Sequence, residues 1–375
     1  MKETIQTFKT VDEIVTGNGA VRQLGHVAAR FGDRCVFVAG RGSARKSGRL
    51  DWVTEILDGA GVKIALYEGV EEDPSVGTVD AIRALLSSAD AKLVIGFGGG
   101  SVIDAAKAAA GLAREKDSTA VFLHKQRLAR PGIPMVAVPT VAGTGAEVTP
   151  NAVITDLEKK VKASIRNGRF LPAVAIVDPE LTYSCPPAVT AASGMDAITQ
   201  AIESYVSIHA SAISDALAFE AFRLLWPNVE RAYRNGQDAQ ARACLSYGSL
   251  MAGMALAAAR LGAVHGIAHP VGVRCGIAHG LVCAVLLPEV VRMNLPYSAE
   301  KFTRLEEAAG GDLVQGIIEL NDRMGLYRKF RECRIPRDEF SAIADESMPS
   351  GSLKANPKAV SREDVIAVLE ATTQR

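Results

Sequence analysis

The sequence has no excess of charge of either sign. Its 375 residues include 42 Lys and Arg against 42 Asp and Glu, so the formal net charge is zero. Proteins that bind nucleic acid or an anionic membrane surface by electrostatics carry a basic surplus or a strongly basic face. We therefore expect neither a nucleic-acid partner nor a membrane partner.

The chain also lacks a long uninterrupted apolar run. Its start, MKETIQTFKT, has no apolar segment of the kind that a secretory signal contains. The most apolar stretch, residues 250–273, is interrupted by Arg260, His265 and His269, which predicts a buried helix and not a membrane span. The hydrophobic fraction of 48% is enough for sizeable cores, so we expect a soluble cytoplasmic protein.

Closely spaced cysteine pairs are missing as well. No CxxC occurs, so neither a disulfide scaffold nor a cysteine zinc site is indicated. We interpret the cysteines as reduced thiols, and the two that flank a histidine-rich region, Cys275 and Cys283, as buried filler. The six are Cys35, Cys185, Cys244, Cys275, Cys283 and Cys333.

What the sequence does contain is a change of pattern near its middle. Up to about residue 178, short Val- and Ile-rich runs alternate with helical stretches, which predicts an α/β domain with a parallel sheet. After about Pro187 the remaining patterns are helical. We predict an α/β domain over residues 1–187 and an all-α domain over residues 188–375. The predicted strands are residues 35–40, 62–69, 92–98, 134–140 and 174–179; the predicted helices are 79–88, 101–113, 195–207, 213–233, 241–262, 281–294, 299–309 and 362–372.

A glycine-rich turn joins a predicted strand to a predicted helix in LVIGFGGGSVIDAAK. Gly98, Gly99 and Gly100 would let the backbone approach a pyrophosphate, and the helix start offers free N–H groups. Alternatively, Ser101 and Asp104 form a capping box that closes the helix without a ligand, although this leaves the glycines unexplained. The spacing is not GxGxxG, so a standard Rossmann fingerprint is absent.

A second polar loop, PTVAGTGAEVTPN at residues 139–151, also follows a predicted strand. Thr140, Thr144 and Thr149 could hydrogen-bond a phosphate, a ribose or the nicotinamide end of a cofactor. A plain polar turn explains the loop equally well when it is judged alone.

Three of the six histidines lie close together in VHGIAHPVGVRCGIAHG. His265 and His269 are four residues apart and share a helical face, Pro270 bends or ends that helix, and His279 opens the next one. A single histidine on an apolar face is usually a satisfied core residue, but three among small residues favour a metal site or catalysis.

An acidic partner for these histidines is expected in SGMDAITQAIESYVS. Asp196 and Gln200 share one face of this helix, away from its apolar stripe. The alternative is that Ser193 caps the helix and Asp196 completes a capping box.

Together these motifs resemble the successive signatures of the iron-containing (group III) alcohol dehydrogenases. The resemblance covers nearly the whole chain, through to the tail NPKAVSREDVIAVLEA. It implies a dehydroquinate-synthase-like fold, with a dinucleotide-binding α/β domain, a helical domain, and metal and substrate between them. It also implies reversible reduction of a small-molecule aldehyde to a primary alcohol by a homodimer or higher oligomer. The matching motifs are GGGSVIDAAK, PTVAGTGAEVTPNAVITD, SGMDAITQAIESYVS, GAVHGIAHPVG and AHGLVCAVLLPEVVRMN.

Carried over by position, the resemblance implies the metal ligands Asp196, Gln200, His265 and His279. Family members usually have His at the place of Gln200, and an amide oxygen is a weaker ligand for a first-row metal. Two outcomes are open. The remaining ligands hold Fe²⁺ or Zn²⁺, or the site is metal-poor, as in a maleylacetate-reductase-like enzyme acting on a charged keto-acid.

Further roles follow from the same resemblance. His269 is expected beside the nicotinamide, on the proton path and at the substrate, Asn151 in the substrate pocket, and Lys162 near the cofactor. Two alternatives to an alcohol dehydrogenase remain: a lyase of the dehydroquinate synthase kind, and a nucleotide-binding protein that has lost catalysis.

Cofactor choice depends on the end of the first predicted strand. Gly40 stands where NAD-preferring members have an Asp that bonds the ribose hydroxyls and repels a 2′-phosphate. The following residues include Arg41, Ser43, Arg45 and Lys46, and resemble the version found in NADPH-using members. The alternative is that these basic residues are only the solvent-exposed start of a helix and do not bind a cofactor. We predict use of NADP(H), or of both cofactors.

Overall fold

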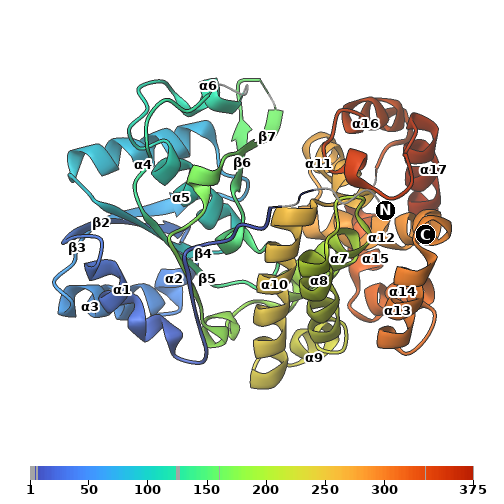
Figure 1. The fold of residues 1–375 in the computed structure, drawn as a ribbon, viewed down its shortest axis with the longest axis horizontal. Coiled ribbons are helices and arrows are strands. Elements are labelled where there is room, and N and C mark those ends of the chain that lie inside the picture. The colour runs from blue at the N-terminus through green and yellow to red at the C-terminus, as the bar shows by residue number, and fades with distance from the viewer. Residues whose placement is uncertain (1–4, 6, 124–126, 160, 334, 375) are drawn as a thin grey trace. The chain divides into compact units, whose positions relative to one another are not determined.

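A computed structural model describes residue 5 and residues 7–123, 127–159, 161–333 and 335–374 of the chain (Figure 1). Contacts between residues divide them into two compact units. The sheet unit comprises Thr10–Ser184, and the helical unit begins at Cys185 and includes the described residues before Thr10. The boundary between the two units therefore lies between residues 184 and 185, whereas the sequence predicts it between residues 187 and 188.

The sheet unit is built on a six-stranded parallel sheet in the order β1-β8-β5-β4-β2-β3. All five predicted strands are confirmed. Four of them are Val- and Ile-rich runs that are almost wholly buried in the parallel sheet, whereas the edge strand β3 is mostly half-buried. The four-residue β1 was not predicted. The strands are β1 (Glu13–Thr16), β2 (Arg34–Gly40), β3 (Lys63–Val70), β4 (Leu93–Gly98), β5 (Met135–Pro139) and β8 (Val174–Val177).

Helices cover both faces of this sheet (Figure 1). The alternation of side chains along β2 shows the two layers: Val36 and Val38 enter the core beneath α4 and α5, whereas Cys35 and Phe37 enter the core beneath α1 and α3. The fold class expected from the alternating pattern is confirmed. The helices of this unit are α1 (Leu24–Ala29), α2 (Ser43–Lys46), α3 (Arg49–Gly59), α4 (Val76–Ser88), α5 (Gly100–Gly111) and α6 (Thr119–Leu123).

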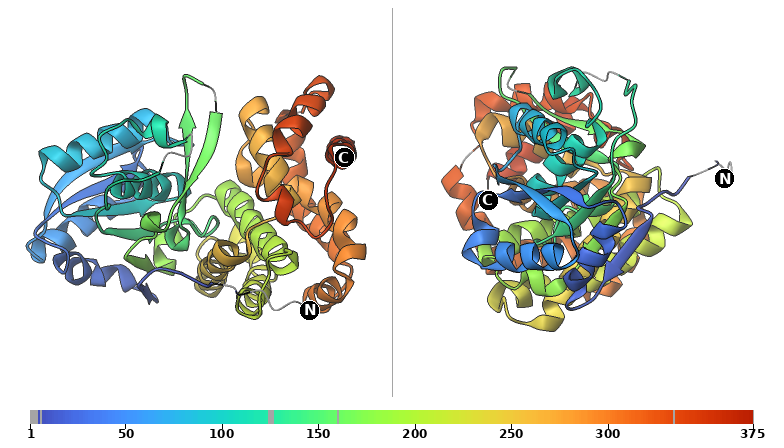
Figure 2. Two further views of the ribbon diagram at one scale, coloured as in Figure 1. Left: turned by 45° about the horizontal axis from the view of Figure 1, so that its top comes forward. Right: turned by 90° about the vertical axis from the view of Figure 1, so that its left-hand side faces the viewer.

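An antiparallel hairpin of β6 (Asn151–Asp156) and β7 (Val161–Arg166) stands apart from the main sheet (Figure 2). This hairpin was not among the predicted strands. β6 alternates half-buried and buried residues, and β7 is mostly exposed or half-buried, so both lack the long apolar runs of the parallel strands. The hairpin places Asn151 and Lys162 in the same unit as the glycine-rich turn.

The helical unit has no strand among its described residues, as predicted. The helix expected over residues 213–233 is interrupted where Pro227 cannot continue the hydrogen-bond ladder. Pro270, in contrast, lies inside the continuous helix Ala263–Cys275, so of the two expected effects of this proline, a bend or an end of the helix, the end is wrong. The helices are α7 (Pro187–Val206), α8 (Ala212–Leu225), α9 (Val229–Arg234), α10 (Ala239–Ala259), α11 (Ala263–Cys275), α12 (His279–Asn294), α13 (Ala299–Ala309), α14 (Leu313–Arg323), α15 (Leu326–Cys333), α16 (Phe340–Ser347) and α17 (Arg362–Thr373).

The most apolar helices of this unit are core helices. The stretch expected to be one buried helix forms α10 and α11, which meet at 101°. The helical segment His279–Tyr297 is long and apolar enough to cross a membrane, but 67% of its apolar window is buried inside the fold. That burial is what a core helix requires.

Candidate active site

The long helix α7 supplies the acidic residue of the site. It begins at Pro187, so Ser193 lies inside the helix, where its Oγ donates to the carbonyl of Val189 at 2.7 Å. The interpretation of Ser193 and Asp196 as a capping box is therefore wrong. Asp196 lies in the middle of the helix and is only 2% exposed. Helix capping thus gives no reason for a carboxylate at this position.

Two histidines from later helices meet this carboxylate. Asp196 Oδ1 lies 3.1 Å from Nε2 of His265 on α11 and 3.8 Å from Nε2 of His279 on α12. Gly280 permits this approach, because a Cβ there would lie 2.4 Å from the carbonyl oxygen of Ala192 on α7. The structure thus brings side-chain atoms of Asp196, His265 and His279 close together.

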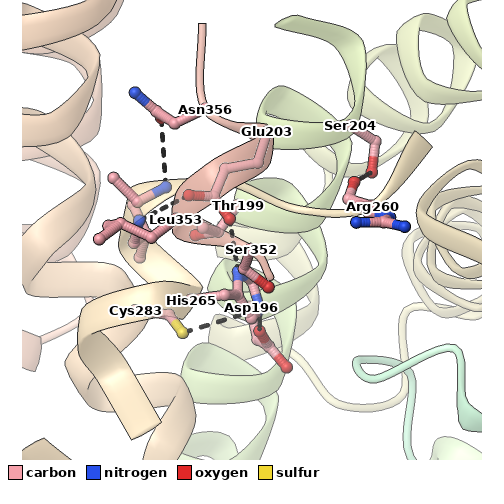
Figure 3. Close-up of polar contacts among 12 residues, drawn as sticks. Asp196, Thr199, Glu203, Ser204, Arg260, His265, Cys283, Ser352, Leu353 and Asn356 are labelled. Atoms are coloured by element: carbon pink, nitrogen blue, oxygen red, sulfur yellow. Dashed lines mark hydrogen bonds and ion pairs between the residues drawn. The ribbon is translucent and has the colours of Figure 1, made fainter. Parts of the chain in front are cut away.

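Glu203 is a member of the site that the sequence analysis missed (Figure 3). Its Oε2 lies 2.6 Å from Nδ1 of His265, and its Oε1 accepts from the backbone N–H of Val264 at 2.6 Å. With Nδ1–H donating to Glu203, Nε2 of His265 faces Asp196: it donates to this carboxylate when it carries a proton, and its lone pair is available to an ion when it does not. The missed pattern is helical spacing, because Glu203 follows Asp196 by seven residues on the same face of α7.

Glu203→Gln is expected to weaken metal binding about 10–100-fold, because an amide cannot match the carboxylate as partner of the imidazole N–H. A competition titration of metal-free protein with a chromophoric chelator measures this affinity. Glu220→Gln is the control, since Glu220 forms a surface ion pair with Arg223. Equal affinities in the two variants would remove Glu203 from the site.

Gln200 contributes an amide one turn after Asp196. Its side chain hydrogen-bonds the Asp196 carboxylate, and its Oε1 is buried without a hydrogen-bond partner. A buried oxygen without a hydrogen-bond partner costs free energy, unless a ligand donates to it or it coordinates an ion. The Gln200 side chain therefore adjoins Asp196 and has a buried amide oxygen that remains available to an ion or a ligand.

Cys283 is buried, as expected, but it also belongs to the histidine cluster. Its Sγ lies 3.6 Å from Nε2 of His279 and 4.0 Å from Nε2 of His265. One ligand atom from each of Asp196, His265, His279 and Cys283 lies within 4.8 Å of the others. The spacing of four residues between His279 and Cys283 was the available indication in the sequence.

His269 lies one turn after His265 on α11. Its ring stacks on that of His279, with centroids 5.1 Å apart and an angle of 29° between the planes. It is half-buried, whereas His265 is only 3% exposed. His269 thus adjoins the cluster without being part of its innermost group.

The electrostatics of the cluster favour charged groups despite burial. Burial raises the pKa of Asp196, but the hydrogen bond from His265 and the charges of both imidazoles outweigh it and lower the pKa. Burial lowers the pKa of His265, but Cys283, Glu203 and Asp196 together raise it well above its ordinary value. The cluster is therefore arranged to stabilise positive charge between its carboxylates.

The glycine-rich turn in the sheet unit lacks a side-chain cap. α5 begins at Gly100 after Gly99, so the expected capping box is wrong. Ser101 Oγ accepts from the backbone N–H of Asp73, and Asp104 Oδ2 accepts from that of Val153. The first-turn N–H groups of α5 are consequently not occupied by a capping side chain, as a phosphate site requires.

Packing explains two of the three consecutive glycines. A Cβ at Gly98 would lie 2.6 Å from Val102, and one at Gly100 would lie 2.8 Å from Thr144. At Gly99 the nearest protein atom would be an ordinary 3.5 Å away, so the protein itself leaves space there. Gly99 is the position where a ligand's approach best accounts for the glycine.

The loop after β5 is tied to a buried lysine. Lys107 Nζ pairs with Asp104 at 3.1 Å and donates to Thr149 Oγ1 at 3.1 Å and to the Asn151 carbonyl. Thr149 is thereby engaged within the protein, and Thr144 Oγ1 accepts from the backbone N–H of Ala146. Asn151 Oδ1 is buried without a hydrogen-bond partner.

The backbone N–H of Thr140 donates to the Gly98 carbonyl at 2.9 Å, which joins this loop to the glycine-rich turn. Lys162 Nζ pairs with Asp73 at 2.6 Å, and Asp73 in turn contacts Ser101. The predicted cofactor residues of this region thus form one connected group.

Burial raises the pKa of Glu147, in the same loop, to about 7, an effect opposed by the charge of Lys107. Between the unfolded value near 4.5 and about 7, the folded protein binds more protons than the unfolded chain, so stability falls as pH rises through this range. Glu147→Gln removes this loss, which amounts to at most about 3 kcal/mol. We expect the Tm of the variant to rise relative to wild type between pH 5 and pH 8. A constant Tm difference across this range would contradict the assignment.

At the end of β2, the basic residues are partly paired. Arg45 pairs with Glu68 at 2.6 Å. Arg41 donates to the Gly69 carbonyl and lies 3.9 Å from Glu71, but its side chain is 71% exposed. Ser43 begins α2. A Cβ at Gly40 would make only ordinary contacts, the nearest at 3.4 Å to Val102, so packing does not require glycine there.

Comparison with known proteins places both units in one family. The sequence profile of iron-containing alcohol dehydrogenases matches residues 12–179, and that of the family's C-terminal domain matches residues 190–373. A 1,3-propanediol dehydrogenase of Klebsiella pneumoniae is 34% identical in an alignment 358 residues long that covers 90% of this chain and 92% of that protein. An NAD-dependent methanol dehydrogenase of Bacillus methanolicus is 29% identical over 95% of this chain and 97% of that protein. The crystal structure of a 1,3-propanediol oxidoreductase superposes with a TM-score of 0.94 at 32% identity, covering 98% of this chain and all of that one.

Proposed function

The chain belongs to the iron-containing alcohol dehydrogenase family and is an oxidoreductase that interconverts alcohols and aldehydes; we propose that its reaction depends on a divalent ion at Asp196, His265 and His279. The observation that carries the proposal is the convergence of these three side chains from α7, α11 and α12. The keto-acid reductase and the catalytically inactive nucleotide-binding protein are not favoured, because the relatives are alcohol dehydrogenases.

The residues present fit a divalent ion, Fe²⁺ or Zn²⁺. Asp196 provides the charge, His265 and His279 provide imidazole nitrogens, and the partnerless Gln200 Oε1 is a further donor in the family's fourth position. An ion bound there supplies Lewis acidity toward the carbonyl oxygen of the substrate. Glu203 fixes the tautomer and direction of His265, and so prepares the site before the ion arrives.

Proton transfer is assigned to His269. Its half-buried ring lies against His279, so it has access both to the cluster and to solvent. Reduction of an aldehyde requires one proton at the oxygen, and an imidazole has a pKa suited to deliver it near neutral pH. Asn151, with its unpartnered amide oxygen, is proposed to contact the substrate.

The nicotinamide cofactor supplies the hydride. We propose that its pyrophosphate binds the uncapped start of α5 at Gly98, Gly99, Gly100 and Ser101, with Asp104, Thr140, Thr144, Thr149 and Lys162 around it. We further propose NADP(H), or use of both cofactors, because no carboxylate stands at Gly40 and Arg41 is exposed beside it. The enzyme is proposed to be cytoplasmic and to form a homodimer or a higher oligomer. Light scattering measures this oligomeric state.

The test is oxidation of NADPH and NADH against a panel of aldehydes and oxo-acids, with protein before and after chelation. We expect aldehyde-dependent oxidation that chelation removes and that Fe²⁺ or Zn²⁺ restores. Metal-free protein that retains full turnover would refute the proposed role of the ion. Turnover on oxo-acids alone would contradict the alcohol–aldehyde assignment.

A further inference from the structure

Four side chains, those of Asp196, His265, His279 and Cys283, each bring one ligand atom into the metal-binding cluster, and Cys283 is the one of the four to which the family resemblance gives no role. We propose that the Cys283 thiolate is a direct protein ligand of the ion, together with Asp196, His265 and His279, and that this set selects Zn²⁺ over Fe²⁺. The inference rests on the proposed metal-dependent function and changes its ligand set. It assigns the fourth ligand to α12, in place of the Gln200 amide on α7.

Four of the six ligand–ligand distances in the cluster lie near those of a tetrahedral site, and all six are within 4.8 Å. Ligands about 2.0–2.3 Å from a tetrahedral ion lie about 3.3–3.6 Å from one another. Sγ of Cys283 lies 3.6 Å and 4.0 Å from Nε2 of His279 and His265, and Asp196 Oδ1 lies 3.8 Å and 3.1 Å from the same two nitrogens. The cysteine is thus as well placed as the carboxylate.

The backbone explains why the thiol reaches this point. His279 and Cys283 are four residues apart on α12, so their side chains leave the helix on one face. Asp196 and Gln200 have the same spacing on α7. Each helix therefore presents one strong ligand and one further donor, and the donor on α12 is a thiol.

The two further donors differ in chemistry. The Gln200 side chain is engaged with Asp196, and its amide oxygen is neutral. A thiolate is a charged, soft donor of the kind that Zn²⁺ accepts alongside imidazole and carboxylate. With Asp196 it would balance both charges of the ion. Binding exchanges the thiol proton for the ion, so one proton per ion passes from Sγ to solvent.

The experiment is titration of metal-free protein with Co²⁺, followed by absorption spectroscopy. A cysteine ligand gives Co²⁺ a thiolate charge-transfer band in the near ultraviolet. We expect this band in wild type and in Cys275→Ser, whose cysteine lies on α11 outside the cluster, and we expect it to vanish in Cys283→Ser. Zn²⁺ affinity of Cys283→Ser should fall by at least the ~10–100-fold that loss of an outer-shell partner causes.

Cys283→Asp serves as a second variant, in case Ser is not tolerated in this buried position. Its carboxylate retains the charge, so it should bind Co²⁺ without the band. Co²⁺ that binds wild type without the band, or a band that persists in Cys283→Ser, would overturn the cysteine ligand but leave the metal centre. Wild type that binds no Co²⁺ would overturn the proposed metal centre, and the cysteine ligand with it. In competition, wild type should retain Zn²⁺ in preference to Fe²⁺ under anaerobic conditions, and a preference for Fe²⁺ would contradict the selectivity.

Discussion

Asp196→Asn is expected to lower kcat/KM for aldehyde reduction by roughly 10³-fold, equivalent to about 4 kcal/mol of transition-state stabilisation. The substitution keeps the size of the side chain but removes the only carboxylate among the proposed ligands, so the ion is lost or held loosely. Steady-state kinetics together with the metal content of the purified variant measure the effect.

A matched control for this prediction is Asp312→Asn, because Asp312 caps α14 and Asn caps helices about as well. Cofactor binding should survive in Asp196→Asn, since the proposed cofactor residues all lie in the sheet unit. A variant that retains wild-type turnover without bound metal would refute the account of Asp196.

Gly40→Asp is expected to reverse cofactor preference, lowering kcat/KM for NADPH by about 30–100-fold while sparing or improving that for NADH. The carboxylate would repel the 2′-phosphate, and two charges about 4 Å apart near a protein surface interact by up to about 4 kcal/mol. The space at Gly40 admits a side chain, so the variant should fold. Steady-state kinetics with both cofactors provide the measurement.

Gly40→Asn is the matched control for charge, since it has nearly the same volume without the carboxylate. It should retain more NADPH activity than Gly40→Asp. If wild type already prefers NADH strongly, or if both variants lose both cofactors equally, Gly40 does not determine the choice.

The parallel sheet is predictable from the sequence because β2, β4, β5 and β8 are almost wholly buried and therefore appear as continuous apolar runs. The edge strand β3 is only partly buried, but it still contains an apolar run, residues 64–67. Strands β1, β6 and β7 are not predictable in this way, because none of them has an apolar run longer than three residues. The continuous helix through Pro270 could not be predicted either, because the rule that proline ends or bends a helix considers only neighbouring residues. A buried helix tolerates a proline when its tertiary contacts compensate for the lost hydrogen bond.

Capping patterns failed twice for one physical reason. Ser101 with Asp104, and Ser193 with Asp196, each have the spacing of a capping box, but neither forms one. Each aspartate is instead used in a contact distant in sequence, with Val153 or with His265. A local pattern cannot reveal such contacts, because it does not show where the helix begins or what packs against it.

The candidate metal cluster was predicted in part. Asp196, His265 and His279 were expected from residue type and family resemblance, whereas Glu203 and the placement of Cys283 were missed. Both missed residues follow an expected ligand on the same helical face, by seven and by four residues. Their contacts depend on how α7, α11 and α12 pack, which residue spacing alone does not determine.

The central claim is tested most directly by anomalous diffraction from crystals of the protein loaded with Zn²⁺, with data collected on both sides of the zinc absorption edge. We predict one strong anomalous peak per chain within bonding distance of Asp196 Oδ1 and of Nε2 of His265 and His279. A peak elsewhere, or none at this cluster in fully loaded protein, would contradict the account.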